Sequence, residues 1–359
     1  MNTQIYELDF EGQNIYVGFD VHLKSWTVTI MTEKITHKTF TQDPKPEALS
    51  NYLKKNFPGG NYFSAYEAGF SGYWIHNKLK ALGIESIVVN PADVPTTDKE
   101  RDQKEDPIDS RKIARGLRNG ELQAIYVPTI TTLENRTLIR TRSMLVKDIT
   151  RYKNRIKSFL YFHGIEIPEA FIKSKSHWSK RFMVWLETIE MLEQSGKDSL
   201  KIIVEIVKNL RATLLETTKK IGALSKTETY KNNVELLRSI PGIGLLTAMV
   251  ILTELETIER FSNTDKLCRF IGFVPSIHNS GESNRTGKLT RRGHGTLRSA
   301  LVESAWTAAR LDSALMKSYI EYCKRMESNE AIIRIAKKLL KRISYVLKNQ
   351  KAYECGIVK

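Results

Sequence analysis

The first 127 residues alternate short apolar runs with turn residues, as in a domain that mixes strands and helices. Runs rich in Val, Ile and aromatic residues predict strands, and apolar residues that recur every three to four positions predict helices. Pro58-Gly59-Gly60 ends the first of these helices, because neither residue type continues a helix. The pattern predicts strands at 14–20, 25–31, 35–41, 61–66 and 84–90 and helices at 46–57 and 72–82.

The order of these elements narrows the fold of this front part. Three strands joined as a meander are followed by alternating helices and strands, which is the order of a ribonuclease H-like domain. Several other α/β folds begin with the same order. The pattern alone therefore predicts an α/β domain and favours a ribonuclease H-like one.

An apolar repeat of seven residues marks the middle of the chain as long helices. One seam runs from 138 to 159, and after a break at 164–168 a second runs from 203 to 224. Two such helices pair either with each other in an intramolecular hairpin or with another subunit in a coiled coil, and the pattern fits both. The first seam consists of Leu138, Leu145, Ile149, Tyr152, Ile156 and Phe159, and the second of Ile203, Val207, Leu210, Leu214, Ile221 and Leu224.

The last third is rich in predicted helices, including an apolar one at 247–255 and a basic amphipathic one at 331–351. Pro241-Gly242-Ile243-Gly244 lies between helices and resembles a helix-hairpin-helix turn, whose glycines let backbone amides approach a DNA phosphate. A tight structural turn without a DNA contact explains it equally well. A loop rich in glycine and basic residues is predicted at 279–295. The predicted domains are 1–128 (α/β), 129–231 (coiled-coil helices, oligomerisation) and 232–359 (helix-rich).

The charge balance adds a partner to this picture. The chain holds 56 Lys and Arg against 40 Asp and Glu, a formal net charge of +16. Such an excess attracts phosphate polyanions, so nucleic acid is the favoured partner over a merely soluble basic surface. The candidate nucleic-acid contacts in the last third are Gly242, Gly244, Arg285, Lys288, Arg291, Arg292 and Arg298.

Other classes of protein are disfavoured. Cys268, Cys323 and Cys355 are odd in number and widely spaced, which suggests neither a disulfide framework nor a zinc site. The first ten residues are acidic and lack the basic-then-apolar pattern of a signal peptide. No stretch approaches the roughly 20 apolar residues of a membrane span. We expect a cytoplasmic protein, associated with the nucleoid when it acts, and no membrane partner.

Four carboxylates are candidates for a metal site. Asp20 and Glu67 each lie at the end of a predicted strand, where adjacent parallel strands bring side chains together. Asp106 and Asp109 are three residues apart, on one helix face, after a helix start favoured by Pro107. Oxygen ligands of this kind suit Mg²⁺ or Mn²⁺, and four can hold two metals for phosphoryl transfer. Helix capping by Asp106 and solvation of the strand-end acids are the plainer explanations. The segment around the last pair holds six acids: Asp98, Glu100, Asp102, Glu105, Asp106 and Asp109.

A serine in the basic loop is the candidate nucleophile. Ser280 lies in Asn279-Ser280-Gly281-Glu282-Ser283 and is followed by the basic residues named above. A serine hydroxyl is a weak nucleophile until a base, a metal or neighbouring cations assist it. On local sequence alone, Ser280 is an ordinary turn serine.

The motifs together resemble the DEDD transposases of bacterial insertion sequences, also called bridge-RNA-guided recombinases. The resemblance runs over nearly the whole chain in the expected order, and its one noted departure is Ser110 in place of an expected Ala. Each motif is weak alone, and the order and spacing make the set specific. The motifs are GFDVH (18–22), YEAG (66–69), KEDPIDS (104–110), IPGIG (240–244), GFVP (272–275) through Ser280-Gly281, and GKLTRRG (287–293).

The resemblance implies a RuvC-like front domain, a coiled-coil middle and a C-terminal transposase domain. It implies that Asp20, Glu67, Asp106 and Asp109 are Mg²⁺ ligands and that Ser280 forms a phosphoserine link to DNA. It also implies tetramers in which one subunit's carboxylates complete another's serine site, with a structured RNA that chooses donor and target DNA. None of this RNA dependence follows from composition or spacing.

Two further functions fit the same residues. A RuvC-like junction endonuclease would use two metals to activate water and form no covalent serine link. A basic protein that only organises nucleic acid would have no catalytic residue at all. The nuclease should tolerate loss of Ser280 but not of Asp20, and the organising protein should tolerate both losses.

Overall fold

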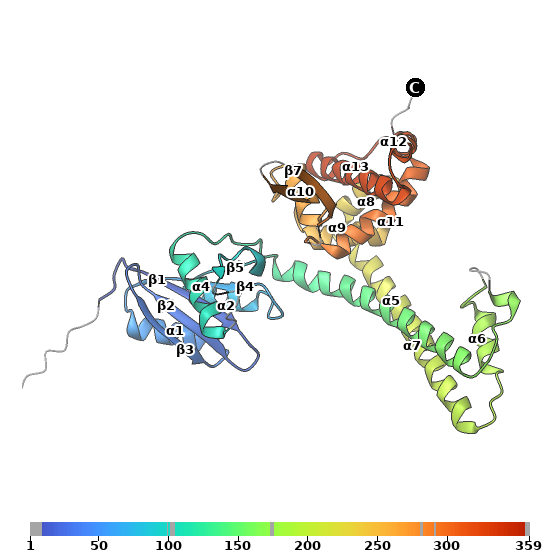
Figure 1. Ribbon diagram of the computed structural model, residues 1–359, viewed down its shortest axis with the longest axis horizontal. Coiled ribbons are helices and arrows are strands. Elements are labelled where there is room, and N and C mark those ends of the chain that lie inside the picture. The colour runs from blue at the N-terminus through green and yellow to red at the C-terminus, as the bar shows by residue number, and fades with distance from the viewer. Residues whose placement is uncertain are drawn as a thin grey trace, which may run out of the picture. The chain divides into compact units, whose positions relative to one another are not determined.

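The chain forms two compact units, Met1–Val127 and Pro128–Lys359, in the computed structural model (Figure 1). The structure describes residues 9–98, 100, 105–172, 176–280, 283–290 and 292–355, apart from the side chains of 277–280 and 283–286. The division falls next to the predicted boundary at 128. The predicted domains 129–231 and 232–359 lie together in the second unit.

A five-stranded sheet forms the centre of the first unit, in the order β3-β2-β1-β4-β5 (Figure 1). The first three strands pair antiparallel, and β1–β4 and β4–β5 pair parallel. The mixed α/β prediction is confirmed, and each predicted strand and helix begins and ends within two residues of the observed one. The elements are β1 (Asn14–Val21), β2 (Trp26–Met31), β3 (Thr36–Gln42), α1 (Pro46–Asn56), β4 (Asn61–Glu67), α2 (Trp74–Ala81), β5 (Glu85–Val89), the 3-10 helix η1 (Pro91–Asp93) and α4 (Asp106–Arg118).

Helices cover both faces of the sheet, and the alternation of side chains along a strand decides which face each residue meets. Phe19 of β1 and Tyr66 of β4 are buried in the apolar cluster that includes α1 and α2. Gly18 and Ala65, one position back, face α4 instead, and Ala65 is buried with Ile113 of that helix. Asp20 and Glu67, two positions beyond Gly18 and Ala65 on the same strands, therefore also face α4.

The second unit is mostly helical, as predicted. Its helices pack around one large apolar cluster, and the α5–α7 pair extends from it to a smaller one that includes α6. The elements are α5 (Ile130–Phe162), the 3-10 helix η2 (Glu169–Phe171), α6 (Lys180–Glu187), α7 (Gln194–Leu224), α8 (Lys231–Arg238), α9 (Leu245–Leu255), α10 (Thr264–Ile271), β6 (Pro275–Ser280), β7 (Ser283–Leu289), α11 (Gly295–Leu311), α12 (Ser313–Cys323) and α13 (Ser328–Asn349).

The two long helices of the middle segment, α5 and α7, pack side by side along the same chain (Figure 1). This is the intramolecular hairpin, one of the two arrangements that the seven-residue repeat allowed. Ile149, Ile156, Val207 and Ile221 of the predicted seams are buried, whereas the other seam residues are only half-buried. A coiled coil between subunits remains a prediction.

Close packing against α11 requires a glycine at position 242, in the turn between α8 and α9. Gly242 has a φ of +90°, and a Cβ added there would lie 2.5 Å from the carbonyl oxygen of Ser304 in α11. Gly244 precedes the first residue of α9, and its Cβ position is open. The sequence IPGIG thus lets α8 turn closely over α11, and a role for Gly244 at a phosphate stays a prediction.

The predicted loop at 279–295 is wrong in its first half. Residues 275–280 and 283–289 form the antiparallel hairpin β6–β7, in which Ser280 pairs with Ser283. The strand signal is weak because β7 reads SNRTGKL, which contains a single apolar residue.

Among the described residues, no helix is long and apolar enough to cross a membrane. The three cysteines form no disulfide with one another.

A buried carboxylate joins three helices of the second unit. Glu254 of α9 has a side chain that is 1% exposed, and it accepts hydrogen bonds of 2.8 and 2.9 Å from the Arg140 guanidinium of α5. Arg136 Nε lies 3.2 Å away, and His294, which caps α11 through the amide of Leu297, lies 3.1 Å away. Burial opposes the ionised form, but the bonds from His294 and Arg140 outweigh it and lower the pKa of Glu254 to about 2.

We expect Glu254→Gln to destabilise the second unit by about 3 kcal/mol, because it leaves the buried Arg136 guanidinium, and that of Arg140, without their counter-charge. The pKa of Glu254 is lowered from 4.5 to about 2, so its stabilisation is present above pH 4.5 and is lost as the pH falls towards 2. Urea unfolding followed by circular dichroism across this pH window measures the effect. Glu235→Gln, an exposed change on α8, is the control. An equal pH dependence in Glu254→Gln and the unmodified protein would contradict the assignment.

Candidate active site

Asp20 and Glu67 lie at the same level of the sheet, on the face that α4 covers. Phe19 of β1 pairs with Tyr66 of β4, so the next residue of each strand carries one of the two acids. Both acids belong to the alternating set that faces α4, as Gly18 and Ala65 do. The parallel pairing of β1 and β4, which the strand-end positions predicted, therefore brings these two carboxylates together.

The first turn of α4 supplies the other two acids. Pro107 occupies an early position, where its missing amide hydrogen costs nothing. Glu105 occupies the N-cap position of α4 and makes no side-chain capping bond, and Asp106 is already the first residue of the helix. Asp106 and Asp109 both lie in the first turn, where the helix dipole favours negative charge. The structure thus removes the capping explanation for Asp106.

Close contact between α4 and β1 fixes this turn against the sheet. A Cβ added at Gly18 would lie 2.1 Å from the amide nitrogen of Ala114 and 2.4 Å from the carbonyl oxygen of Ser110, so only glycine fits. Ser110 is fully buried, and its hydroxyl lies 2.9 Å from that of Thr29 in β2. The serine that departs from the expected alanine is accommodated by this hydrogen bond.

A histidine links the first pair of acids. His22 follows β1, and its Nε2 lies 3.1 Å from a carboxylate oxygen of Asp20 and 3.3 Å from one of Asp106. Ligand atoms of these three residues all lie within 4.8 Å of one another, close enough to share one metal ion. Asp106 is the most exposed of the four acids, with a side chain 53% exposed.

A lysine links the second pair. The Nζ atom of Lys112, one turn along α4, lies 2.6 Å from Asp109 and 3.7 Å from Glu67. The lysine side chain is only 13% exposed. Burial opposes its charge, but the hydrogen bond and attraction from Asp109 outweigh burial and raise the pKa of Lys112. Its ammonium group therefore stays charged between the two carboxylates.

The two pairs act on each other electrostatically. Burial raises the pKa of Asp20, and repulsion from Asp106 and Asp109 adds to the rise, while His22 opposes it. Burial likewise raises the pKa of Glu67, with Lys112 opposing and Asp109 and Asp20 adding. A half-buried site with four acids in mutual repulsion favours a bound cation. The donor set consists mainly of carboxylate oxygens and fits a hard divalent metal.

The remaining acids of the 98–109 segment do not all join this site. Glu100 forms a two-pronged ion pair of 2.9 and 3.1 Å with Arg115. The Arg115 bond, opposed by burial, lowers the pKa of Glu100 to about 2. Asp102 lies outside the described residues. Among the acids that the structure describes, the contacts through His22 and Lys112 join the four that the sequence singled out.

In the second unit, Ser280 is the last residue of β6, beside the turn of the hairpin. Its side chain and that of Arg285 lie outside the described part of the structure, as does the whole of Arg291. Lys288 and Arg292 are exposed. Arg298 instead donates to the carbonyl oxygens of Gly272 and Thr290, at 3.3 and 2.9 Å, and so links the two segments that flank the hairpin.

Sequence reasoning missed His22 and Lys112 as members of the site. Both carried a signal. His22 stands two residues after Asp20, the spacing that places side chains on one face of a strand. Lys112 stands three residues after Asp109, the spacing of neighbours on a helix surface. A nitrogen-bearing side chain at these spacings marks each acid as part of an organised cluster.

Comparison with known proteins gives two family matches that together span both units. A DEDD transposase model of the IS110 type matches residues 17–164, and a model of the transposase IS116/IS110/IS902 family matches residues 234–321. The first range contains the four acids and the second contains Ser280.

The chain is also similar to individual curated proteins. It is 30% identical over 246 residues to protein y4qE of Sinorhizobium fredii, covering 68% of this chain and 58% of that protein. It is 26% identical over 357 residues to y4rJ of the same organism, covering 91% and 90%. Its identity to the transposase for insertion sequence element IS1533 of Leptospira borgpetersenii is 26% over 308 residues, covering 82% and 85%. The matched region thus spans little more than half of y4qE but most of the other two.

Proposed function

The chain belongs to the DEDD transposase family of insertion sequences, and we propose that, as a DNA transposase, it cuts and rejoins DNA strands through a covalent phosphoserine intermediate. One observation carries the phosphoryl transfer in this proposal: Asp20, Glu67, Asp106 and Asp109 converge from β1, β4 and α4. Such an acidic cluster in a chain of net charge +16 repels the polyanion that the rest of the protein attracts. Phosphoryl transfer gives the cluster a purpose, because it needs cations beside the reacting phosphate.

We assign the four acids as ligands of Mg²⁺ or Mn²⁺. When bound, such an ion polarises a phosphoryl oxygen and stabilises the charge that develops on it. His22 and Lys112 orient the carboxylates through the contacts of 2.6 to 3.7 Å described above. The buried Ser110–Thr29 hydrogen bond and the close packing at Gly18 hold α4, and with it Asp106 and Asp109, against β1.

Ser280 is the proposed nucleophile. Its hydroxyl oxygen forms a bond to phosphorus, its proton leaves to a base, and one phosphodiester P–O bond to a sugar breaks as that sugar oxygen takes up a proton. In the reverse step a sugar hydroxyl from another strand displaces the serine oxygen. The number of phosphoester bonds is unchanged throughout, so rejoining needs no added energy source.

The proposed partners are donor and target DNA and a structured guide RNA. The basic residues that the sequence singled out for them are Arg285, Lys288, Arg291, Arg292 and Arg298. Lys288 and Arg292 are exposed, whereas Arg298 is bonded to the carbonyl oxygens of Gly272 and Thr290. Charge of this kind gives affinity without sequence preference. Choice of sequence is therefore assigned to base pairing by the RNA.

A strand-exchange assay tests the proposed function. Two labelled DNA duplexes are incubated with the protein, Mg²⁺ and the RNA that co-purifies with it, and that RNA is sequenced to identify the guide. We expect strands that combine parts of both duplexes, together with a protein–DNA adduct on a denaturing gel. Nicked strands without rejoined products or adduct would contradict the proposal.

A metal-dependent junction endonuclease is the second candidate, and the acidic cluster itself favours it. Four carboxylates with bound cations suffice to activate water for hydrolysis, without any residue of the second unit. The nuclease would tolerate loss of Ser280 but not of Asp20. The Ser280→Ala variant therefore distinguishes the two functions.

We expect a dimer or tetramer when nucleic acid is bound. The α5–α7 seams bury each other, but Phe162 at the end of α5 and Leu192 before α7 are 83% and 100% exposed. Light scattering with DNA and RNA present measures the assembly. Phe162→Ser with Leu192→Ser should weaken it, because the change removes exposed apolar surface, while Lys219→Ser, at an exposed residue of α7 that is not apolar, is the control. A mass of one chain under these conditions would overturn the expectation.

A further inference from the structure

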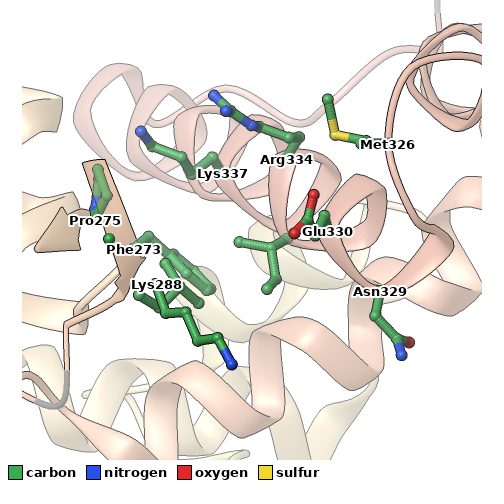
Figure 2. Close-up of a pocket in the computed structure, with 11 residues that line it drawn as sticks. Phe273, Pro275, Lys288, Met326, Asn329, Glu330, Arg334 and Lys337 are labelled. Atoms are coloured by element: carbon green, nitrogen blue, oxygen red, sulfur yellow. The ribbon is translucent and has the colours of Figure 1, made fainter. Parts of the chain in front are cut away.

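A pocket lies in the second unit at the foot of the β6–β7 hairpin. It has a volume of about 530 Å³ and is formed by the two ends of the hairpin and the first turns of α13 (Figure 2). Sites for small organic groups occupy roughly 300–1,000 Å³, so the pocket is large enough for more than a bare phosphate. It lies outside the acidic cluster of the first unit, and of its lining residues only Lys288 has a role assigned above.

The floor of the pocket is apolar. Phe273, which precedes β6, is buried, and Leu289 of β7 and Ile333 of α13 are half-buried beside it. Surface of this kind contributes nothing to binding a phosphate group. It does favour a flat aromatic ring, whose burial removes apolar area from water.

Three cationic side chains stand around this floor. Lys288 comes from the hairpin, and Arg334 and Lys337 come from α13, on the other side of the pocket in the view of Figure 2. The structure pairs none of the three with an acidic side chain among the residues it describes. Their combined charge favours an anionic occupant. It disfavours the insertion of a second copy of this chain, whose net charge is +16.

Two polar side chains complete the lining. Glu330 and Asn329, both in the first turn of α13, are exposed at the pocket. The Glu330 carboxylate repels phosphate but accepts hydrogen bonds from the exocyclic amino group of a base. The Asn329 amide both donates and accepts hydrogen bonds. The apolar floor matches the ring of a base, the three cations match its phosphates, and Glu330 and Asn329 can bond to polar groups on the edge of the base.

We propose that this pocket holds one unstacked nucleotide of the DNA strand that the hairpin engages. Its base lies on Phe273 and Ile333, and the adjoining phosphates lie at Lys288, Arg334 and Lys337. The proposal rests on the proposed function only in taking DNA as the substrate. β6 runs from the pocket at Pro275 to Ser280, a span of about 17 Å for five extended residues. A strand held in the pocket is thereby positioned along the hairpin that carries the serine.

Equilibrium binding without metal tests the pocket independently of cutting. Full-length protein in EDTA is titrated with a labelled single-stranded DNA and with versions carrying one abasic residue at each position in turn. We expect one position at which loss of the base weakens binding about tenfold. Ile333→Trp, which fills the pocket and keeps its charge, should bind the intact and abasic strands equally.

A charge variant keeps the test informative if Ile333→Trp fails to fold. Arg334→Gln with Lys337→Gln should reduce the slope of log affinity against log salt by about 1.4, the value for two phosphates of a single strand. Lys317→Gln with Arg325→Gln removes two exposed cations of the same unit that do not line the pocket, and should leave the slope unchanged.

Three outcomes would overturn the proposal. The abasic effect could persist in Ile333→Trp with an unchanged salt slope in the charge variant. The effect could occur only with RNA of the same sequence. Ile333→Trp could alter the mass in light scattering and leave DNA binding intact, which would assign the pocket to a second copy. A protein that fails to exchange strands but meets the binding expectations would contradict the proposed function and leave the pocket standing.

Discussion

Ser280→Ala is expected to abolish strand exchange, with a loss on the order of 10⁴-fold or more, because no other group can take the place of a covalent nucleophile. DNA and RNA affinity should stay within about twofold, since one hydroxyl contributes little to a largely electrostatic interface. The measurement is the exchange assay together with a denaturing gel that detects the protein–DNA adduct.

Ser283→Ala is the matched control for this variant. Ser283 of β7 pairs with Ser280 of β6, so the two substitutions remove the same atom from paired positions of one hairpin. We expect Ser283→Ala to retain exchange and adduct. An adduct that persists in Ser280→Ala, or robust exchange by that variant, would show that another residue is the nucleophile.

Removing the metal or one of its ligands should have an effect of similar size. EDTA and Asp106→Asn are each expected to lower exchange by at least about 10³-fold, because a bound cation supplies several kcal/mol of transition-state stabilisation. Mg²⁺ or Mn²⁺ added back should restore the EDTA-treated protein but not the variant. The variant should bind DNA at least as well as the unmodified protein, since it removes a negative charge that repels phosphate.

Glu105→Gln is the control for Asp106→Asn. Glu105 precedes Asp106, is exposed, and makes no capping bond, so its substitution removes the same charge one residue away. We expect it to leave exchange nearly unchanged. Full exchange in a metal-free buffer, or equal losses in Glu105→Gln and Asp106→Asn, would contradict the ligand assignment.

The front of the fold was predictable because its signals are local. The strand and helix bounds follow from turn residues and short apolar runs, and the start of α4 follows from Pro107. The convergence of Asp20 and Glu67 was also within reach, since it needs only parallel pairing of the strands that end in them.

The rest depends on contacts between distant residues. A seven-residue repeat gives the direction of an apolar face but not its partner, so the sequence left open whether α5 and α7 pair within one chain. Glu254 stands in an apolar helix, and its partners Arg140 and His294 are 114 and 40 residues away along the chain. Nothing near Glu254 in the sequence indicates a buried ion pair. The pocket at α13 likewise joins two segments that no local pattern connects.

The antiparallel pairing of α5 and α7 makes them a rigid spacer with a fixed rotational phase. α5 is 33 residues long, about 50 Å at 1.5 Å per residue. Its residue Ile139 belongs to the large apolar cluster of the unit, and Ile156 belongs to the smaller cluster around α6.

Each residue of a helix adds about 100° of rotation. One residue inserted into α5 between Ile139 and Ile156 would rotate the smaller cluster around α6 by about 100° relative to the large cluster. Two full turns inserted into both helices at once, close to seven residues each, would keep both faces in place and lengthen the spacer by about 10 Å. The length of the α5–α7 spacer can therefore change over evolution only in such steps, taken by both helices together.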